Sequence, residues 1–387
     1  MKRIYFDNAS TTFPKPPSVA DAVTRYLTEN GCNISRGGYQ KAYQTEETVF
    51  ETRELLCRMF AGTDCKNVIF TKNATESLNI LLKGYLKPGD HILVSSVEHN
   101  AVMRPLVQLQ RQGITFSRIP CLPDGQLQCE YLEKLLTADT KAVVMTHASN
   151  VCGTLLPLRE TGQFCARHGL RFFADVSQTA GIWPVNMEEM HLDALAFTGH
   201  KGLLGPQGIG GFLLREDFIN EIEPLLSGGT GSISHTEEIP SFMPDRFEPG
   251  TMNLPGIFGL NAALKWLEKT GIDNIRAHEL ELTAHFLEGL KEIPNIRIIG
   301  QTDAGQKGIR ERTGVVSLQT LTKDIAQAAW ELDENYGIMT RTGLHCAPYA
   351  HKTLGTFPTG TIRFSFGWKN TKQEIDTALQ ALTDIVK

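Results

Sequence analysis

The sequence predicts an α/β fold, in which a large domain with a mostly parallel sheet is joined to a smaller α+β domain. Two observations lead to this prediction. Through the middle of the chain, short apolar segments alternate with amphipathic ones, a pattern typical of a parallel sheet covered by helices on both faces. The chain also has 387 residues, which is too many for a single hydrophobic core of ordinary size. We therefore expect one large and one smaller domain.

The large domain is expected to span residues 17–250. Six apolar segments within it have the length of buried strands, and turn residues or helical patterns separate them. In the helix expected after the first strand, Leu78, Leu81 and Leu82 fall on one face. The expected strands are residues 67–70, 91–96, 141–147, 170–176, 193–198 and 208–215.

The glycine-rich stretch GPQGIGG, at residues 205–211, is similar to a dinucleotide-binding fingerprint. That fingerprint requires a helix directly after its glycines. Here the apolar run FLLR follows instead, which predicts a strand. We therefore reject a dinucleotide site and expect a loop that joins two strands.

The smaller domain is expected to combine residues 1–16 with residues 251–387. Residues 229–256 are rich in Gly, Pro, Ser and Thr, which indicates a long active-site loop that leads into a linker. A helix is expected from about Ile257, and the chain ends in the helical pattern KQEIDTALQALTDIV.

Composition disfavours several classes of function. The net charge of −5, with both signs interspersed, disfavours nucleic acid as the main partner. No apolar run is long enough to span a membrane and no signal-peptide core is recognisable, so we expect a cytoplasmic protein. The eight cysteines form no C-x-x-C pair and no Cys/His cluster with zinc-ligand spacing. We expect no metal site, and seven reduced, mostly buried thiols.

Polar and ionisable residues follow five of the expected strands. In open α/β sheets, ligands bind beyond the carboxyl ends of the strands, so these residues are expected to meet at one edge of the sheet. In chain order they are Ala74 and Thr75, then His99, then Asn150, then Asp175 and Gln178, then Thr198, His200 and Lys201.

These residue types suit pyridoxal 5′-phosphate. Thr75 begins a helix, whose N-terminus binds a phosphate. Asp175 ends an apolar strand and is costly to bury unless it faces a cation, such as a protonated pyridine nitrogen. A desolvated Lys201 has a lowered pKa and forms a Schiff base with an aldehyde. His99 can stack on an aromatic ring, and Gln178 and Asn150 can bond to a ring oxygen.

Ordinary structural roles remain open for each of these residues taken alone. Lys201 is then a surface lysine, Asp175 a helix cap, Asn150 part of an Asx turn and Gln178 a turn residue. His99 is then an ordinary histidine at the rim of the sheet.

Several motifs of the chain resemble those of the class V aminotransferase family, specifically its cysteine desulfurase and selenocysteine lyase branch. They are NATES, EHNA, SNVCGT, DVSQTAG, GHK, RFEPGTMN and RTGLHCA, in the family's order and spacing, and the resemblance runs from YFDNAST to IRFSF. It implies the fold-type I arrangement of PLP-dependent transferases, with a mostly parallel seven-stranded sheet. It also implies a homodimer with active sites at the interface.

The resemblance implies a role for each residue of the site. Lys201 is the Schiff-base lysine, Asp175 the partner of the pyridine nitrogen and His99 the residue stacked on the ring. Thr198 stands where the family usually has Ser, and Arg363 matches the arginine that receives the substrate α-carboxylate. The remaining expected roles are phosphate binding by Thr75, Thr198, His200 and the other subunit's Thr251, and contacts to the ring oxygen or substrate by Gln178 and Asn150.

The stretch RTGLHCAP, at residues 341–348, indicates the type of reaction. Cys346 is bracketed by Arg341 and His345, neighbours that favour a nucleophilic thiolate. In the cysteine desulfurases that this motif resembles, the cysteine attacks the substrate sulfur and carries a persulfide while alanine is released. The loop looks short, which is similar to the sulfur-mobilisation (SUF-type) and selenocysteine lyase group. A short loop implies slow turnover unless an acceptor protein comes to the persulfide.

The substrate is expected to be L-cysteine or L-selenocysteine. Ser35-Arg36-Gly37 stands where the short-loop group often has His-Arg-Gly. Arg36 is thus retained as a candidate substrate contact, with Arg341, although a solvated surface role for Arg36 is equally open. The alternatives are a selenocysteine-selective lyase, another PLP aminotransferase or β-lyase, and a catalytically idle binding partner in sulfur-cofactor assembly.

Overall fold

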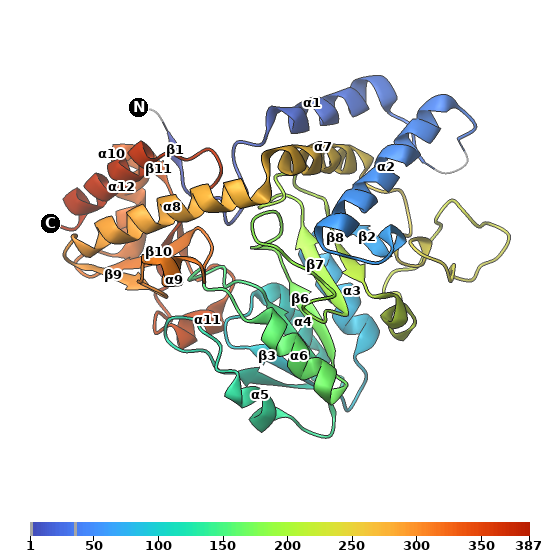
Figure 1. Ribbon diagram of the computed structural model, residues 1–387, viewed down its shortest axis with the longest axis horizontal. Coiled ribbons are helices and arrows are strands. Elements are labelled where there is room, and N and C mark those ends of the chain that lie inside the picture. The colour runs from blue at the N-terminus through green and yellow to red at the C-terminus, as the bar shows by residue number, and fades with distance from the viewer. Residues whose placement is uncertain (1–2, 35–36) are drawn as a thin grey trace.

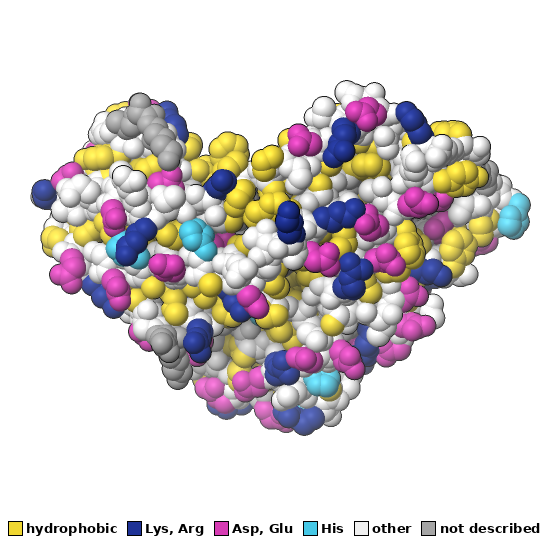
Figure 2. Space-filling model, turned by 45° about the horizontal axis from the view of Figure 1, so that its top comes forward, with side chains coloured by type: hydrophobic (Ala, Val, Ile, Leu, Met, Phe, Trp, Pro, Cys, Tyr) yellow, Lys and Arg dark blue, Asp and Glu magenta, His cyan; other side chains and the backbone are white. Residues whose placement is uncertain are grey.

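The computed structural model describes residues 3–34 and 37–387. Its outline has two lobes separated by a notch (Figure 2), and each lobe is associated with its own sheet (Figure 1). The larger sheet has seven strands: β2 (Val68–Thr71), β3 (His91–Ser95), β4 (Thr115–Ile119), β5 (Thr140–Thr146), β6 (Arg171–Asp175), β7 (Ala194–Thr198) and β8 (Gly210–Leu214).

The strand order of this sheet is β2-β8-β7-β6-β5-β3-β4. Only β8 runs antiparallel to its neighbours, β2 and β7, and the other adjacent pairs are parallel. The prediction of an α/β fold with a mostly parallel seven-stranded sheet is therefore confirmed. Because the parallel strands end at one edge, the residues that follow them are brought together there.

The sequence pattern located six of the seven strands to within two residues at each end. The seventh, β4, was not among the segments that the apolar pattern indicated. It lies at the edge of the sheet, and four of its five residues are exposed or half-buried. An edge strand of this kind carries polar residues and lacks the continuous apolar run of a central strand.

Helices cover both faces of the large sheet, as alternate residues of β5 show. Val143 and Met145 lie in one apolar core, and Ala142 and Val144 lie in the core on the opposite face. The helices of this region are α1 (Pro17–Arg25), α2 (Gln40–Met59), α3 (Ala74–Tyr85), α4 (Asn100–Gln110), α5 (Glu130–Leu135), α6 (Leu158–His168) and α7 (Leu254–Thr270). Short helical turns are η1 (Tyr26–Asn30), η2 (Cys65–Asn67), η3 (Glu216–Glu221) and η4 (Asp245–Phe247).

The start of α3 is fixed by a side-chain cap. Asn73 Oδ1 accepts a hydrogen bond of 3.0 Å from the backbone N–H of Glu76. Leu78, Leu81 and Leu82 are fully buried on one face, as the spacing predicted. The cap leaves the first N–H groups of α3, at Ala74 and Thr75, directed beyond the sheet edge.

The smaller region is built on a four-stranded antiparallel sheet, in the order β12-β13-β10-β9, and a separate parallel pair β1-β11. The strands are β1 (Ile4–Tyr5), β9 (Ile296–Ile299), β10 (Val315–Thr320), β11 (Ile338–Met339), β12 (Arg341–Gly343) and β13 (Thr361–Ser365). The helices are α8 (Ile272–Lys291), α9 (Gln306–Ile309), α10 (Ile325–Tyr336), α11 (Pro348–Thr353) and α12 (Lys372–Ile385).

The N-terminal segment packs into the core of this smaller region. The Phe6 ring lies 5.3 Å from Phe366 and 6.1 Å from Phe364, centroid to centroid. In contrast, α7 buries Leu260 and Leu264 in a core that it shares with Val19 of α1. The division into residues 17–250 and residues 1–16 with 251–387 stays a prediction.

The segment between η3 and α7 is irregular apart from η4, as its composition predicted. Among the residues described, no helix is both long and apolar enough to cross a membrane.

Candidate active site

A cavity of about 300 Å³ lies at the carboxyl edge of the large sheet, where the smaller region meets it. This volume is in the range of small-molecule sites, which begins near 300 Å³. Twelve predicted site residues line it: Ala74, Thr75, His99, Asn150, Asp175, Gln178, Thr198, His200, Lys201, Arg341, Cys346 and Arg363.

The large sheet delivers the central residues of this cavity directly. Asp175 is the last residue of β6, and Thr198 is the last residue of the neighbouring strand β7. Lys201 follows three residues after Thr198, and the hydroxyl of Thr12 donates a 2.8 Å hydrogen bond to the Lys201 carbonyl. The turn that carries Lys201 is thus anchored to the N-terminal segment.

The surroundings of Lys201 favour the neutral form of its amine. Burial lowers the pKa of its ammonium group to about 8, although the nearby Asp175 carboxylate acts in the opposite direction. A lysine with this pKa has an appreciable fraction of free amine near neutral pH, which a surface lysine lacks. The side chain is therefore suited to act as a nucleophile or a base.

The Asp175 carboxylate is buried and oriented by the residue two positions on. Its Oδ1 accepts hydrogen bonds from the Ser177 backbone N–H at 3.0 Å and from the Ser177 hydroxyl at 2.5 Å. Gln178 is oriented by donation from Nε2 to the Ala9 carbonyl, at 3.2 Å. Asp175 forms no ion pair with the described residues, so its charge remains available to a cation in the cavity.

His99 caps the start of α4, and its ring is neutral. The backbone N–H of Ala101 donates to His99 Nδ1 at 3.0 Å. Burial, and then the positive charge of Lys201, lower the pKa of the imidazole to about 4. A neutral ring that accepts at Nδ1 carries its proton on Nε2.

Five buried polar atoms of residues that line the cavity lack a hydrogen-bond partner among the described residues, and three of them, Thr198 Oγ1, His200 Nδ1 and Asn150 Oδ1, belong to residues of the large sheet's edge. A buried polar group without a partner costs about 1–3 kcal/mol, so such groups usually bind a ligand or water. Burial lowers the pKa of His200 to about 4, so its ring is neutral. Together with the free N–H groups of α3, these atoms fit a phosphorylated ligand with polar ring substituents.

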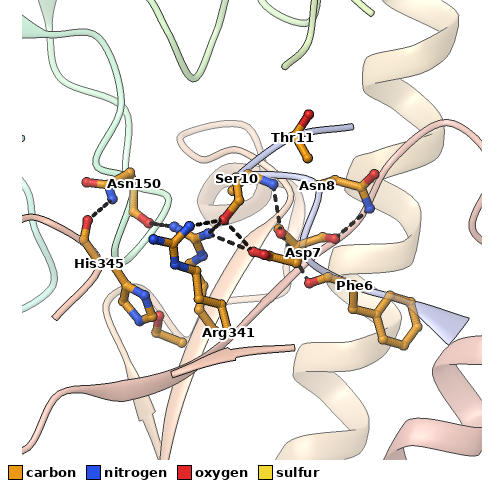
Figure 3. Close-up of polar contacts among 12 residues, drawn as sticks. Phe6, Asp7, Asn8, Ser10, Thr11, Asn150, Arg341 and His345 are labelled. Atoms are coloured by element: carbon orange, nitrogen blue, oxygen red, sulfur yellow. Dashed lines mark hydrogen bonds and ion pairs between the residues drawn. The ribbon is translucent and has the colours of Figure 1, made fainter. Parts of the chain in front are cut away.

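Two arginines meet on the N-terminal segment at the other side of the cavity. Arg363 Nη2 donates to Asp7 Oδ1 at 2.9 Å and to the Ser10 hydroxyl at 2.7 Å. Arg341 Nη1 donates to the same hydroxyl at 2.6 Å, and Figure 3 shows Ser10 and Asp7 beside Arg341. Arg363 Nη1 donates to the Asn150 carbonyl at 3.0 Å, while its buried Nε has no partner in the described part of the chain.

The sequence pattern did not indicate Asp7 and Ser10 as site residues. The sequence does contain a signal that could have indicated them. The polar run DNAS directly follows the apolar residues of β1, within the motif YFDNAST that carries the family resemblance. Ion pairing between positions so far apart in the chain has no local pattern, so only the fold reveals it.

Cys346 lies at the mouth of the cavity on a short and fixed loop. Only four residues separate β12 from α11, which confirms the short loop that the sequence predicted. His345 and Cys346 both have positive φ, of 45° and 58°, a strained region for residues other than glycine. Asn100 N–H donates to the Cys346 carbonyl at 2.8 Å, and Asn150 Nδ2 donates to the His345 carbonyl at 2.8 Å (Figure 3).

His345, one of the two neighbours expected to favour a thiolate at Cys346, carries no positive charge. The His345 ring is buried, and its Nε2 is 2.9 Å from the Thr361 hydroxyl. Burial, and then the charge of Arg363, lower the pKa of this imidazole to about 2, so it is neutral. The cations that line the cavity with Cys346 are Arg341, Arg363 and Lys201.

Among the predicted residues that the structure describes, Thr251 does not line this cavity. Thr251 is exposed and lines a separate groove of the same chain, beside Phe247 and Glu248. Its role in a second subunit's site stays a prediction. Arg36, with Ser35, lies outside the described residues.

The remaining cysteines are free thiols, and Cys346 is the exposed one among the eight. In the part of the chain that the structure describes, no group of three or more His, Cys, Asp or Glu side chains is placed to bind a metal ion.

The fold and the cavity define a class of proteins in which a buried lysine, a carboxylate and an anion site meet at the edge of a mostly parallel sheet. A family model described as aminotransferase class-V matches residues 4–378. The chain therefore belongs to the class V aminotransferase family.

Within this family, the chain is similar to proteins named cysteine desulfurase. It is 33% identical over 392 residues to a probable cysteine desulfurase of Pyrococcus abyssi, covering 99% of this chain and 94% of that one. A probable cysteine desulfurase of Methanothermobacter thermautotrophicus is 31% identical over 386 residues, with coverage of 99% and 94%.

The chain is also similar to solved structures of proteins named cysteine desulfurase. The apo cysteine desulfurase of Thermococcus onnurineus has a TM-score of 0.92 at 32% identity, with 99% of this chain and 94% of that chain covered. The cysteine desulfurase CsdA of Escherichia coli has a TM-score of 0.88 at 27% identity, with coverage of 99% and 94%.

Proposed function

We propose that this protein is a PLP-dependent cysteine desulfurase, which removes sulfur from L-cysteine, releases L-alanine and carries the sulfur as a persulfide on Cys346. The observation that carries the proposal is the placement of an exposed thiol, Cys346, in the same cavity as the buried amine of Lys201. An aminotransferase has no need of that thiol. The names of the relatives at 31% and 33% identity support the same activity.

The residues of the cavity fit pyridoxal 5′-phosphate. Lys201 would hold its aldehyde, Asp175 its ring nitrogen and His99 the face of its ring. The unpartnered atoms of Thr198 and His200, with the start of α3, would hold its phosphate, and Gln178 and Asn150 would bond to its ring oxygen. When bound, this cofactor supplies an electron-accepting ring that stabilises negative charge on the substrate Cα.

Arg363 binds the substrate α-carboxylate. Its Nε is buried and has no partner among the described residues, so this donor is available. The contacts from Nη2 to Asp7 and Ser10 fix the plane of the guanidinium before substrate arrives. A fixed planar donor suits a carboxylate, which binds guanidinium groups with two oxygens in one plane.

Lys201 moves the proton. With its pKa lowered to about 8, the amine accepts a proton from the substrate Cα and later returns it to carbon. Asp175, which favours the charged form of Lys201, keeps the pKa from falling further. Alanine needs a proton at Cα and one more at Cβ: Lys201 returns the proton that it took from Cα, and the proton that Cys346 loses on becoming a thiolate supplies the other.

Cys346 receives the sulfur. Its thiolate attacks the substrate sulfur, so a bond forms between Cys346 Sγ and that sulfur while the substrate Cβ–S bond breaks. The electron pair of the broken bond stays with the substrate carbon, which is protonated and becomes the methyl group of alanine. The products are alanine and a Cys346 persulfide, and no external oxidant is needed.

The proposal includes a homodimer, an acceptor protein and a cytoplasmic location. Exposed aromatic residues Tyr39, Tyr43 and Phe50 share one face of the α2 segment, a surface typical of a subunit contact. All eight cysteines are free, which agrees with a reducing compartment.

The test is alanine release by the purified protein, with its cofactor confirmed by absorbance. L-cysteine and L-selenocysteine are supplied in parallel to the wild type and to Cys346→Ala, with dithiothreitol as a small acceptor. Alanine from L-cysteine that disappears in the variant supports a desulfurase. Alanine from L-selenocysteine alone identifies a selenocysteine-selective lyase, and alanine from neither overturns the proposal in favour of another PLP reaction.

A further inference from the structure

Two segments that surround Cys346 contain no acidic residue. Residues 99–123 and 335–373 include no Asp or Glu, although the chain as a whole has a net charge of −5. Any counter-charge for the arginines and lysines of these segments must therefore come from elsewhere in the fold, as it does for Arg363, which pairs with Asp7.

The two segments form one continuous surface. Asn100 N–H donates to the Cys346 carbonyl at 2.8 Å, and the Arg118 guanidinium lies 4.0 Å from the centroid of the Tyr349 ring. A further hydrogen bond of 3.2 Å runs from the Thr353 hydroxyl to the Ser96 carbonyl. The start of α4, the edge strand β4 and helix α11 therefore lie together beside the Cys346 loop.

Four cations of this surface define what we call the cationic rim: Arg104, Arg111, Arg118 and Lys352. Arg104 is exposed on α4, Arg111 is exposed directly after the end of α4, two turns further on, and Lys352 is exposed on α11. Within the described residues, none of the four forms an ion pair, whereas Arg3, Arg58 and Arg159 elsewhere on the surface are paired with carboxylates.

Apolar side chains lie among these cations. Val107 and Leu122 are 48% and 41% exposed, and Phe357 is 47% exposed. Lys352 lies over the rings of Tyr349 and Phe357, at 5.7 Å and 5.1 Å, and Arg118 over Tyr349. Stacking of this kind holds long side chains in place, so less conformational entropy is lost when a partner binds.

We propose that the cationic rim is the docking surface for the protein that accepts sulfur from Cys346, and that this partner has an acidic face around its accepting thiol. The inference rests on the proposed function. The Cys346 loop is short and hydrogen-bonded at both His345 and Cys346, so the sulfur cannot travel and the acceptor must come to it.

The transfer step balances without an added oxidant. The partner thiol attacks the outer sulfur of the Cys346 persulfide, so a new sulfur–sulfur bond forms on the partner while the bond to Cys346 Sγ breaks. Cys346 leaves as a thiolate and takes up the proton of the attacking thiol, while the outer sulfur keeps its own proton on the partner's persulfide.

A protein fits this surface better than a nucleic acid. Phosphate groups would be attracted by the cations, but the aliphatic side chains of Val107 and Leu122 form no favourable contact with a phosphate. A folded protein surface buries those side chains and pairs the cations with carboxylates at once.

The test uses the holoenzyme and two synthetic peptides, each with one central cysteine. Acidic residues flank the cysteine in one peptide and lysines flank it in the other, with all other positions identical. Alanine release from L-cysteine is measured with each peptide and with dithiothreitol, and the persulfide on the peptide is detected by mass spectrometry.

Two charge-reversal variants are compared. The rim variant is Arg104→Glu/Arg111→Glu/Lys352→Glu, and the control is Lys87→Glu/Lys269→Glu/Lys291→Glu, three exposed lysines in other segments. We expect the acidic peptide to accelerate alanine release by wild type and control about tenfold more than the basic peptide. The rim variant is expected to lose this preference while its rate with dithiothreitol is unchanged, and high salt should weaken the preference.

The outcomes separate the two proposals. If dithiothreitol supports no alanine release in the wild type, the proposed function itself fails. If dithiothreitol supports release but the two peptides act equally, or the control loses the preference as much as the rim variant, the docking inference is overturned. Equal action of the peptides together with rim-dependent binding of tRNA on a filter would assign the rim to nucleic acid instead.

Discussion

The carboxylate of Asp7 lies 2.9 Å from Nη2 of Arg363, although 356 positions of the chain separate the two residues. Both side chains are largely removed from solvent, with exposed fractions of 21% for Asp7 and 2% for Arg363. Burial lowers the pKa of Arg363, and the charge of Asp7 opposes that change. The pair therefore keeps a buried guanidinium charged and oriented at the side of the cavity.

Asp7→Asn is expected to weaken substrate binding more than turnover. The amide retains the shape of Asp7 but removes the charge that orients Arg363, so KM for L-cysteine should rise about tenfold while kcat changes little. The measurement is steady-state alanine release. Asp333→Asn, which breaks the exposed ion pair with Arg3, is the matched control and should leave KM unchanged. An unchanged KM in Asp7→Asn would contradict a positioning role.

Lys201 of the cofactor-free protein is expected to react as an amine with a pKa near 8. Reductive methylation of Lys201 by formaldehyde, followed by mass spectrometry, should rise to half its maximum near pH 8, compared with about 10.4 for free lysine. Because Asp175 raises the pKa of Lys201, Asp175→Asn should move the midpoint to lower pH. A midpoint near that of free lysine would show that Lys201 is not desolvated.

Much of the site could be predicted from the sequence because the residues follow strands. Asp175, Thr198 and Lys201 are each adjacent to an apolar strand, and parallel strands bring their ends together. A residue at a strand end therefore has a position in space that depends on a local pattern. The cavity confirms that these three residues meet.

The parts that could not be predicted depend on packing between distant segments. The partner of Arg363, Asp7, belongs to the other end of the chain, and no periodicity links the two. The neutral state of His345 follows from its burial against Thr361, whereas the sequence shows only that it precedes Cys346. The edge strand β4 has no continuous apolar run, because most of its residues are exposed or half-buried and can be polar.

Thr198→Val is expected to separate a cofactor role from a structural one. The Thr198 hydroxyl is buried and makes no hydrogen bond with the described residues, so its loss should leave the stability of the cofactor-free protein unchanged or raise it by about 1 kcal/mol. Affinity for pyridoxal 5′-phosphate should fall about tenfold, because one phosphate contact is lost. Urea unfolding and absorbance titration measure the two quantities. A destabilised cofactor-free variant with normal affinity would refute the phosphate role.

Cys346 is expected to be the first thiol alkylated by iodoacetamide. It is the exposed cysteine of the chain, whereas burial raises the pKa of Cys129 to about 11 and that of Cys121 to about 12. A protonated thiol that is buried, as in Cys121, or half-buried, as in Cys129, reacts slowly, so we expect Cys346 to react at least about tenfold faster than either. Peptide mapping after a short pulse at pH 7.5 gives the order. Alkylation of Cys129 at the same rate would contradict the burial pattern.

Glu279, on α8, is a buried carboxyl that the proposed reaction does not use. It lines a small cavity of about 30 Å³ next to Gln178 and Lys201, and within the described residues its carboxyl has no hydrogen bond or ion pair. Burial raises the pKa of this group to about 8 from an ordinary value of 4.5. The folded protein thus keeps a proton on Glu279 at neutral pH.

Glu279→Gln is expected to change how stability depends on pH. Between pH 4.5 and 8 the unfolded chain releases the Glu279 proton while the folded chain retains it, so this residue makes stability fall as pH rises through that window and level off above it. Glutamine cannot ionise, so the variant should gain up to ~4 kcal/mol relative to wild type between pH 5 and pH 8. Urea unfolding at both pH values measures the difference, with the exposed Glu288→Gln on the same helix as control. Parallel pH profiles for wild type and Glu279→Gln would show that the carboxyl is ionised in the folded protein.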